Sequence, residues 1–179
     1  MKLEDVTRRH RIGKYIDYKN YKIGLEIGVR EGNNSYNLLK SSKLEKLYCV
    51  DPWTMTRVRG MTRNSNGNKF MSEAVVKLNE FGDRAIMIRA KSQEVSHLFY
   101  DGFFDFIHID GAHTRPWIDQ DIELYWDKCR SGGLFTGHDY SSNPKHAGTV
   151  KDAVDEFVKR EKLKLYCTND RLATWMIQK

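Results

Sequence analysis

Polar side chains follow two apolar runs of the chain and could act together on a substrate. Asp110 follows FDFIHI (104–109), and His138 and Asp139 follow LFTG (134–137). If these runs are neighbouring strands of a parallel sheet, their carboxyl ends meet at one edge and the polar side chains converge. Carboxylates and imidazoles bind divalent ions such as Mg²⁺ or Mn²⁺, and a bound ion lowers the pKa of a hydroxyl. We therefore predict a metal site at Asp110, His138 and Asp139; the alternative is a pocket shaped by hydrogen bonds without a metal.

His113, in the segment after Asp110, is a candidate general base. An imidazole has an unperturbed pKa of about 6.5, so it can take a proton from a hydroxyl near neutral pH. We predict catalytic roles for His113 and Asp110. The alternative for His113 is a histidine that packs or hydrogen-bonds in its loop, and His108 is expected to be structural.

A glycine-containing turn near the N-terminus offers a second binding place. The stretch KIGLEIGVREGNN (22–34) is typical of a buried strand, a sharp turn and a helix start. Gly28 and Gly32 permit positive φ and close approach of a ligand, and the free N–H groups of the helix face the gap. A dinucleotide loop needs G-x-G-x-x-G, but Arg30 stands at the middle position. Because the carboxylate of Glu26 repels phosphate and suits an ammonium and a sulfonium, we predict S-adenosylmethionine (SAM) as the cofactor.

Asp51 ends the next apolar run, KLYCV (46–50). A carboxylate at the end of a second strand can accept hydrogen bonds from both hydroxyls of a ribose. We predict that role for Asp51; the alternative is an aspartate that caps the turn before Pro52. Trp53 could stack on an adenine or pack in the core.

Alternating strands and helices are expected to position these side chains. We predict strands at 22–27, 46–50, 85–89, 104–109 and 134–137, then a hairpin-like pair at 163–167 and 172–177. Helices are expected at about 33–41, 69–81, 92–99, 116–129 and 149–162, with Asn33 or Asn34, Pro116 and Thr149 at helix starts and Gly132-Gly133 in a turn. The pattern predicts an α/β fold with a doubly wound, mostly parallel sheet. Residues 1–21 are expected to form an arm or helix, and residues 54–68 a flexible loop or lid.

Length and composition fit a single domain over residues 1–179. Apolar residues make up 40% and charged residues 30% of the chain, with a formal net charge of +6. That excess of positive charge permits nucleic acid as a partner without requiring it. The cysteines lack metal-ligand spacing, which suggests a reducing compartment, and no apolar run is long enough to span a membrane. We expect a cytoplasmic protein without membrane partners.

Three blocks of sequence resemble a known family. LEIGVREGNNS (25–35), LYCVDPW (47–53) and FDFIHIDGAHTRPWIDQDIELYWDKCRSGGLFTGHDY (104–140) are similar to class I SAM-dependent methyltransferases, above all to the small single-domain group related to sugar and macrolide O-methyltransferases. The resemblance implies a seven-stranded Rossmann-like sheet with an antiparallel C-terminal strand. It implies that the cofactor contacts Glu26, Gly28, Gly32, Asp51, Lys91, Ser92 and Asp110. It also implies that a divalent ion is held by Asp110, His138 and Asp139.

The chain departs from this pattern at Ala112. Many members have a second acidic residue there, two positions after the first aspartate, so the departure increases the importance of His113. The acceptor pocket would be built by residues 1–20, 54–68 and 140–148, or completed by a partner subunit in a homo-oligomer.

These observations predict transfer of a methyl group from SAM to a small-molecule acceptor, at a hydroxyl oxygen of a sugar or other metabolite. Two alternatives stay open. The first is a nucleic-acid methyltransferase, which Arg57, Arg59 and Arg63 permit. The second is a non-catalytic SAM-binding module.

Overall fold

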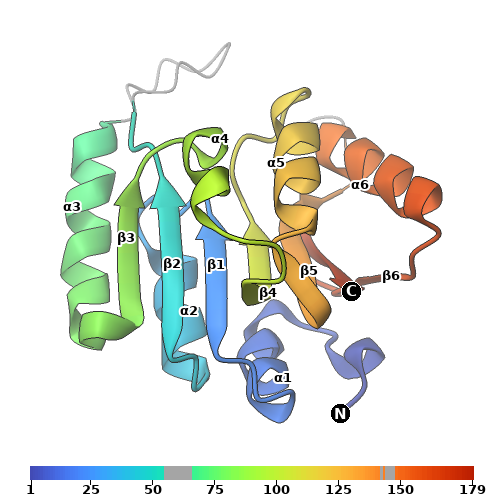
Figure 1. The fold of residues 1–179 in the computed structure, drawn as a ribbon, viewed down its shortest axis with the longest axis horizontal. Coiled ribbons are helices and arrows are strands. Elements are labelled where there is room, and N and C mark those ends of the chain that lie inside the picture. Colours follow the sequence, from blue (N-terminus) through green and yellow to red (C-terminus); the bar gives the residue numbers. More distant parts are fainter. Residues whose placement is uncertain (55–65, 142, 144–147) are drawn as a thin grey trace.

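The computed structural model describes residues 1–54, 66–141, 143 and 148–179. The strands form a seven-stranded sheet in the order β3-β2-β1-β4-β5-β7-β6 (Figure 1). The strands are β1 (Ile23–Ile27), β2 (Lys46–Asp51), β3 (Ala85–Arg89), β4 (Phe104–Ile109), β5 (Cys129–Tyr140), β6 (Leu165–Cys167) and β7 (Ala173–Gln178). The predicted α/β architecture is confirmed, including both strands of the C-terminal pair.

Strand directions place several strand ends at one edge of the sheet. β1 pairs in parallel with β2 and β4, β2 with β3, and β4 with β5, whereas β7 is antiparallel to β5 and β6. The predicted antiparallel C-terminal strand is therefore confirmed. The switch point of the sheet lies between β1 and β4, and ligands bind at the carboxyl ends of strands there. Ile27 lies beside Ile109, and Ile109 beside Gly137, so the segments that follow β1, β4 and β5 meet at this edge.

The fifth strand begins earlier than the sequence predicts. β5 starts at Cys129, so Gly132-Gly133 lies inside the strand and not in a preceding turn, and Cys129 is not part of a helix. The pairing with β4 explains the extra length. Phe104 pairs with Cys129 whereas Phe106 pairs with Leu134, so β5 carries additional residues between these two pairs. Gly132, with φ of 75°, supplies the backbone conformation that the irregularity needs.

Helices lie on both faces of the sheet (Figure 1). The α-helices are α1 (Ile12–Tyr18), α2 (Asn33–Ser41), α3 (Gly67–Leu78), α4 (Ser92–Val95), α5 (Trp117–Trp126) and α6 (Gly148–Glu161). Short 3₁₀ turns are η1 (Leu3–Asp5), η2 (Arg9–Arg11), η3 (Asn79–Arg84) and η4 (Ser96–Leu98).

The predicted helix starts are wrong at three places. The N-cap of α2 is Gly32, whose φ of 77° is left-handed, so the pair Asn33-Asn34 does not cap this helix. Pro116 is the N-cap of α5 and not its first residue. Thr149 lies inside α6, where its hydroxyl donates to the carbonyl oxygen of His113. At Gly32 a left-handed backbone precedes the helix, and at Thr149 a tertiary contact engages the hydroxyl; local propensity reports neither.

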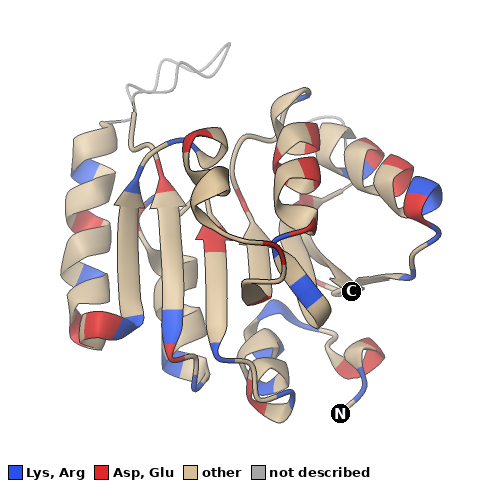
Figure 2. Ribbon diagram, in the orientation of Figure 1, with Lys and Arg blue, Asp and Glu red and all other residues tan. Residues whose placement is uncertain are grey.

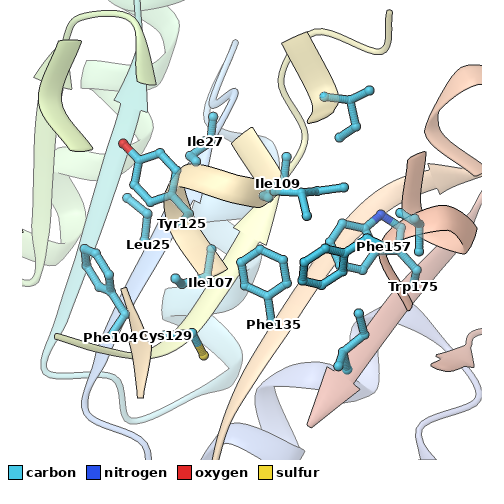
Figure 3. Close-up of a cluster of buried hydrophobic side chains, with 14 of the residues drawn as sticks. Leu25, Ile27, Phe104, Ile107, Ile109, Tyr125, Cys129, Phe135, Phe157 and Trp175 are labelled. Atoms are coloured by element: carbon cyan, nitrogen blue, oxygen red, sulfur yellow. The ribbon is translucent and has the colours of Figure 1, made fainter. Parts of the chain in front are cut away.

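Side chains of β1 alternate between two buried layers. Leu25 and Ile27 pack with residues of β4, α5 and α6, among which Figure 3 shows Ile109, Tyr125 and Phe157. Glu26 points to the other layer, where Asn34 of α2 is bonded to it. The N-terminal arm, α1, α2 and α3 contribute to the apolar packing of that second layer.

The N-terminal arm is part of this second layer. Leu3 and Val6 are buried, as is Ile16 of α1. The backbone N–H of Arg9 donates to Asp170 Oδ2 at 2.7 Å, and Asp170 lies in the connection between β6 and β7. Since β6 runs parallel to β5, this connection lies at the edge of the sheet where the carboxyl ends meet. The arm therefore passes next to the predicted site at Arg9, before α1 begins.

The predicted loop at 54–68 falls mostly outside the described residues, and so do Arg57, Arg59 and Arg63. In Figure 2, Lys and Arg residues are spread over many helices and strands. Within the described part of the chain, no helix combines the length and the apolar character that crossing a membrane requires.

Candidate functional site

The turn between β1 and α2 brings the backbone against the end of β4. Gly28 has a φ of 87°, and a Cβ at this position would meet the carbonyl oxygen of Asp110 at 2.1 Å. Only glycine fits, because the conflict is with rigid backbone. The N–H of Asp110 donates to the carbonyl oxygen of Ile27 at 2.7 Å. The predicted cofactor turn and the predicted catalytic aspartate therefore share one edge.

Glu26 is buried behind this turn. It is 1% exposed and accepts hydrogen bonds from Asn34 Nδ2 at 2.9 Å and from the Ser35 hydroxyl. Burial raises the pKa of Glu26 to about 7, although the hydrogen bonds from Ser35 and Asn34 oppose the rise. Glu26 thus fixes the first turn of α2, directly after Gly32. Contact of Glu26 or Gly32 with a cofactor stays a prediction.

Asp51 lies at the end of β2, and backbone groups orient its carboxylate. Oδ2 accepts from the N–H of Arg30 at 2.9 Å and Oδ1 from the N–H of Trp53 at 2.7 Å. A carboxylate oxygen can accept more than one hydrogen bond, so both oxygens keep capacity for ribose hydroxyls. Trp53 is 3% exposed and its indole N–H donates to the Arg30 carbonyl at 2.8 Å. It packs in the core and leaves no open face for an adenine.

Lys91 and Ser92 begin the short helix that follows β3. Ser92 is buried, and its hydroxyl donates to a carboxylate oxygen of Asp121 on α5 at 2.5 Å. Lys91 is exposed and lies 3.9 Å from Glu94, measured from Nζ to Oε1. Burial raises the pKa of Asp121 to about 6. The sequence did not single out Asp121, which holds Ser92 in place, and contact of Lys91 or Ser92 with an adenine stays a prediction.

Asp110, His113 and Asp139 converge at the ends of β4 and β5. His113 Nε2 lies 2.9 Å from Asp139 Oδ2 and 3.5 Å from Asp110 Oδ1. His138 Nδ1 lies 3.2 Å from Asp139 Oδ1 and 3.9 Å from Asp110 Oδ1. The structure thus brings together the three residues predicted as metal ligands and adds His113 between the two carboxylates.

The charges of this cluster depend on one another. The carboxylates of Asp110 and Asp139 raise the pKa of His113 to about 9, against the opposing effect of burial. Burial alone would raise the pKa of Asp139, but His113 and His138 hold it below its ordinary value. His113 is therefore protonated at neutral pH in this arrangement. A role as free base would require a pH above its pKa of about 9 or the loss of a carboxylate neighbour.

The same cluster fits a divalent cation. One ligand atom each from Asp110, His113 and Asp139 lie within 4.8 Å of one another. His113 Nε2 is buried and has no hydrogen-bond partner among the described residues, so its close contacts with the carboxylates are ion pairs without hydrogen-bond geometry. Carboxylate oxygens around an imidazole nitrogen form a donor set suited to Mn²⁺ or Mg²⁺. Binding of an ion would displace the proton from His113.

Arg9 is the residue that the sequence did not mark. Its Nη2 donates to Asp110 Oδ2 at 3.1 Å, and its Nε donates to Asn34 Oδ1 at 3.1 Å. His108 Nε2 lies 3.2 Å from the same Nη2. The run TRRHR (7–11) shows only a basic arm, and its position depends on the distant Asp170. Local spacing therefore could not have placed Arg9 at the site.

Comparisons with known proteins identify the family and the fold. The family described as "Methyltransferase domain" matches residues 25–140. Among curated proteins, none matches this sequence.

Solved methyltransferase structures share the fold. A candidate caffeoyl-CoA O-methyltransferase from Staphylococcus aureus is 19% identical, with 96% of this chain and 82% of that chain covered and a TM-score of 0.71. An O-methyltransferase from Bacillus cereus in complex with SAH is 14% identical, with 99% and 84% covered and a TM-score of 0.71. A candidate rRNA methylase from Clostridium thermocellum is 16% identical, with 99% and 96% covered and a TM-score of 0.65.

The match to the family covers more than half of the chain and includes the glycine turn, Asp51, Asp110 and Asp139. The fold is shared with the methyltransferase structures over nearly the whole chain. The chain therefore belongs to this methyltransferase-domain family and is a class I SAM-dependent methyltransferase.

Proposed function

We propose that this protein transfers the methyl group of SAM to a hydroxyl oxygen of a small molecule such as a sugar or another hydroxylated metabolite. One carbon–sulfur bond of the sulfonium breaks as the oxygen–methyl bond forms. SAH leaves, and the proton of the hydroxyl is released. The chain must hold the sulfonium carbon and the acceptor oxygen in line and exclude water from them.

One observation carries this proposal: the glycine turn and the acidic cluster meet at Asp110. The Gly28 position is in contact with the Asp110 backbone, while the Asp110 carboxylate lies 3.5 Å from His113 Nε2. A cofactor on the turn would thus have its reacting end beside the cluster. The carboxylates and histidines at the ends of β4 and β5 are suited to a hydroxyl, whose proton must be removed.

A divalent ion at this cluster would be held by Asp110, Asp139 and His113, with His138 beside them. When bound, such an ion lowers the pKa of a hydroxyl and so supplies the acidity that the reaction needs. His113 would then act as a ligand through Nε2 and not as a base. The Thr149 hydroxyl, bonded to the His113 carbonyl, would hold the loop in place during the reaction.

The fold alone does not identify the molecule that accepts the methyl group. Structures of candidate small-molecule and rRNA methyltransferases resemble this chain to a comparable extent. Oxygen as the acceptor atom is supported by the acidic cluster, because a divalent ion held there would acidify a hydroxyl.

The test is a methyl-transfer assay with SAM and a panel of catechols, sugars and other hydroxylated metabolites, with Mn²⁺ or with a chelator. Ribosomal RNA is included as a separate acceptor. We expect a methyl ether as the product and turnover that the chelator suppresses. Methylation confined to RNA bases would refute the small-molecule assignment. Tight SAM binding with no turnover on any acceptor would favour a non-catalytic module.

A further inference from the structure

The Arg9 side chain spans the space between the glycine turn and the acidic cluster. Nε is bonded to Asn34 in the first turn of α2, and Nη2 to Asp110 at the end of β4. Its side chain is 29% exposed. Arg9 therefore touches both halves of the site while keeping access to solvent.

His108 is arranged to accept a hydrogen bond from Arg9. The Thr136 hydroxyl donates to the Ile107 carbonyl at 2.9 Å, so it must accept from His108 Nδ1, which lies 2.9 Å away. That assignment leaves the lone pair of Nε2 facing Arg9. The ring is then neutral, with Nδ1 as the donor and Nε2 as the acceptor. A neutral acceptor and a carboxylate thus orient the same guanidinium nitrogen.

The arm that carries Arg9 is also held by contacts with the connection between β6 and β7. The Arg9 N–H donates to Asp170 Oδ2, and the N–H of Asn169 donates to the carbonyl oxygen of Thr7 at 2.8 Å. Arg8 Nη1 lies 3.4 Å from Asp170 Oδ1. These contacts deliver Arg9 to the edge of the sheet without placing Arg8 in the site.

The guanidinium keeps donors that its contacts do not use. Within the described part of the chain, Nε and Nη2 of Arg9 make hydrogen bonds and Nη1 makes none. Nη1 carries two N–H groups, and either of them can donate a charge-assisted hydrogen bond to a carboxylate oxygen. The site therefore offers a fixed cation with free donors next to the glycine turn.

The methionyl end of SAM carries an ammonium and a carboxylate on one carbon atom. The carboxylate of Asp110 can accept from the ammonium, and Arg9 lies 3.1 Å from that carboxylate. We propose that Arg9 binds the α-carboxylate of SAM and thereby selects cofactors with an intact amino-acid end. This inference rests on the proposed function, because it names the subsite of the same cofactor.

Calorimetric titration with SAM and with decarboxylated SAM tests the proposal, since the two ligands differ by the carboxylate alone. The wild type is expected to bind SAM at least about tenfold more tightly, the contribution of one charge-assisted contact. Arg9→Gln should reduce this preference to less than about twofold. Arg11→Gln is the matched control, because Arg11 lies in the same short turn η2 and its side chain makes no hydrogen bond or ion pair with the described residues. This variant should keep the full preference.

Several results would overturn the proposal. If Arg9→Gln keeps the preference for SAM, or weakens the binding of both ligands equally, Arg9 does not bind the carboxylate. If Arg9→Gln raises KM only for an acidic acceptor, its donors serve the acceptor instead. Equal binding of both ligands by the wild type overturns this inference alone, whereas binding of neither overturns the proposed function as well. Thermal denaturation of each variant, with Arg9→Lys as a charge-preserving variant, checks that the fold is intact.

Discussion

Replacing Glu26 by glutamine should stabilise the protein above pH 7 and change its stability little near pH 5. The Glu26 carboxyl is 1% exposed, and its pKa is raised from 4.5 to about 7. Between these values the folded protein keeps a proton that the unfolded chain releases. The contribution of the Glu26 carboxyl to the free energy of unfolding is therefore present in full below pH 4.5 and is lost as the pH rises through about 7.

The size of the effect follows from the same values. The gap from 4.5 to about 7, at about 1.36 kcal/mol for each pH unit, corresponds to about 3 kcal/mol. A glutamine can keep both hydrogen bonds of Glu26. Its Oε1 can accept from Asn34, and its Nε2 can donate to the Ser35 hydroxyl, which rotates to accept. The variant removes the ionisation and preserves the packing.

Urea unfolding between about pH 5 and about pH 8, in the presence of a chelator, measures this prediction. The difference in free energy of unfolding between Glu26→Gln and the wild type should grow by about 2–3 kcal/mol across that range. Glu45→Gln is the control, because Glu45 is exposed on the surface and paired with Lys22. A Glu26→Gln difference that stays constant with pH would refute the claim that Glu26 is buried with a raised pKa.

Three further predictions follow from the site. Gly28→Ala should lower the free energy of unfolding by about 1–3 kcal/mol and abolish SAH binding. Gly82→Ala is the control and should retain binding, because Gly82 also has positive φ but a Cβ there meets nothing within 4 Å. Equal SAH affinity in both variants would contradict the close approach of the Gly28 backbone to Asp110. Asp51→Ala should weaken SAM binding more than about tenfold in calorimetry, with the exposed Asp101→Ala as control, and an unchanged affinity would exclude the ribose contact. Asp139→Asn should remove Mn²⁺ binding measured by electron paramagnetic resonance, and binding equal to that of the wild type would place the ion elsewhere.

Much of the fold could be predicted because apolar runs with polar ends are a local signal. The strands at 85–89 and 104–109 match β3 and β4, since each is an apolar segment bounded by polar or glycine residues. The C-terminal hairpin follows from its short polar connection. The early start of β5 could not be predicted, because it depends on pairing with β4 and not on its own composition.

The site was predictable in its positions and less so in its contacts. Asp110, His138 and Asp139 could be grouped because strand ends meet at one edge of a parallel sheet. That His113 lies between the carboxylates depends on how its loop is held, including the bond from Thr149. Arg9 could not be found, because its place is set by Asp170, a residue at the other end of the chain.

A crystal structure with SAH and Mn²⁺ tests the central claim most directly, because it locates the cofactor and the ion relative to Asp110. We predict SAH on the Gly28 turn and an anomalous peak for Mn²⁺ among Asp110, His113 and Asp139. SAH bound away from the turn, or an ion bound only at sites remote from Asp110, would contradict it.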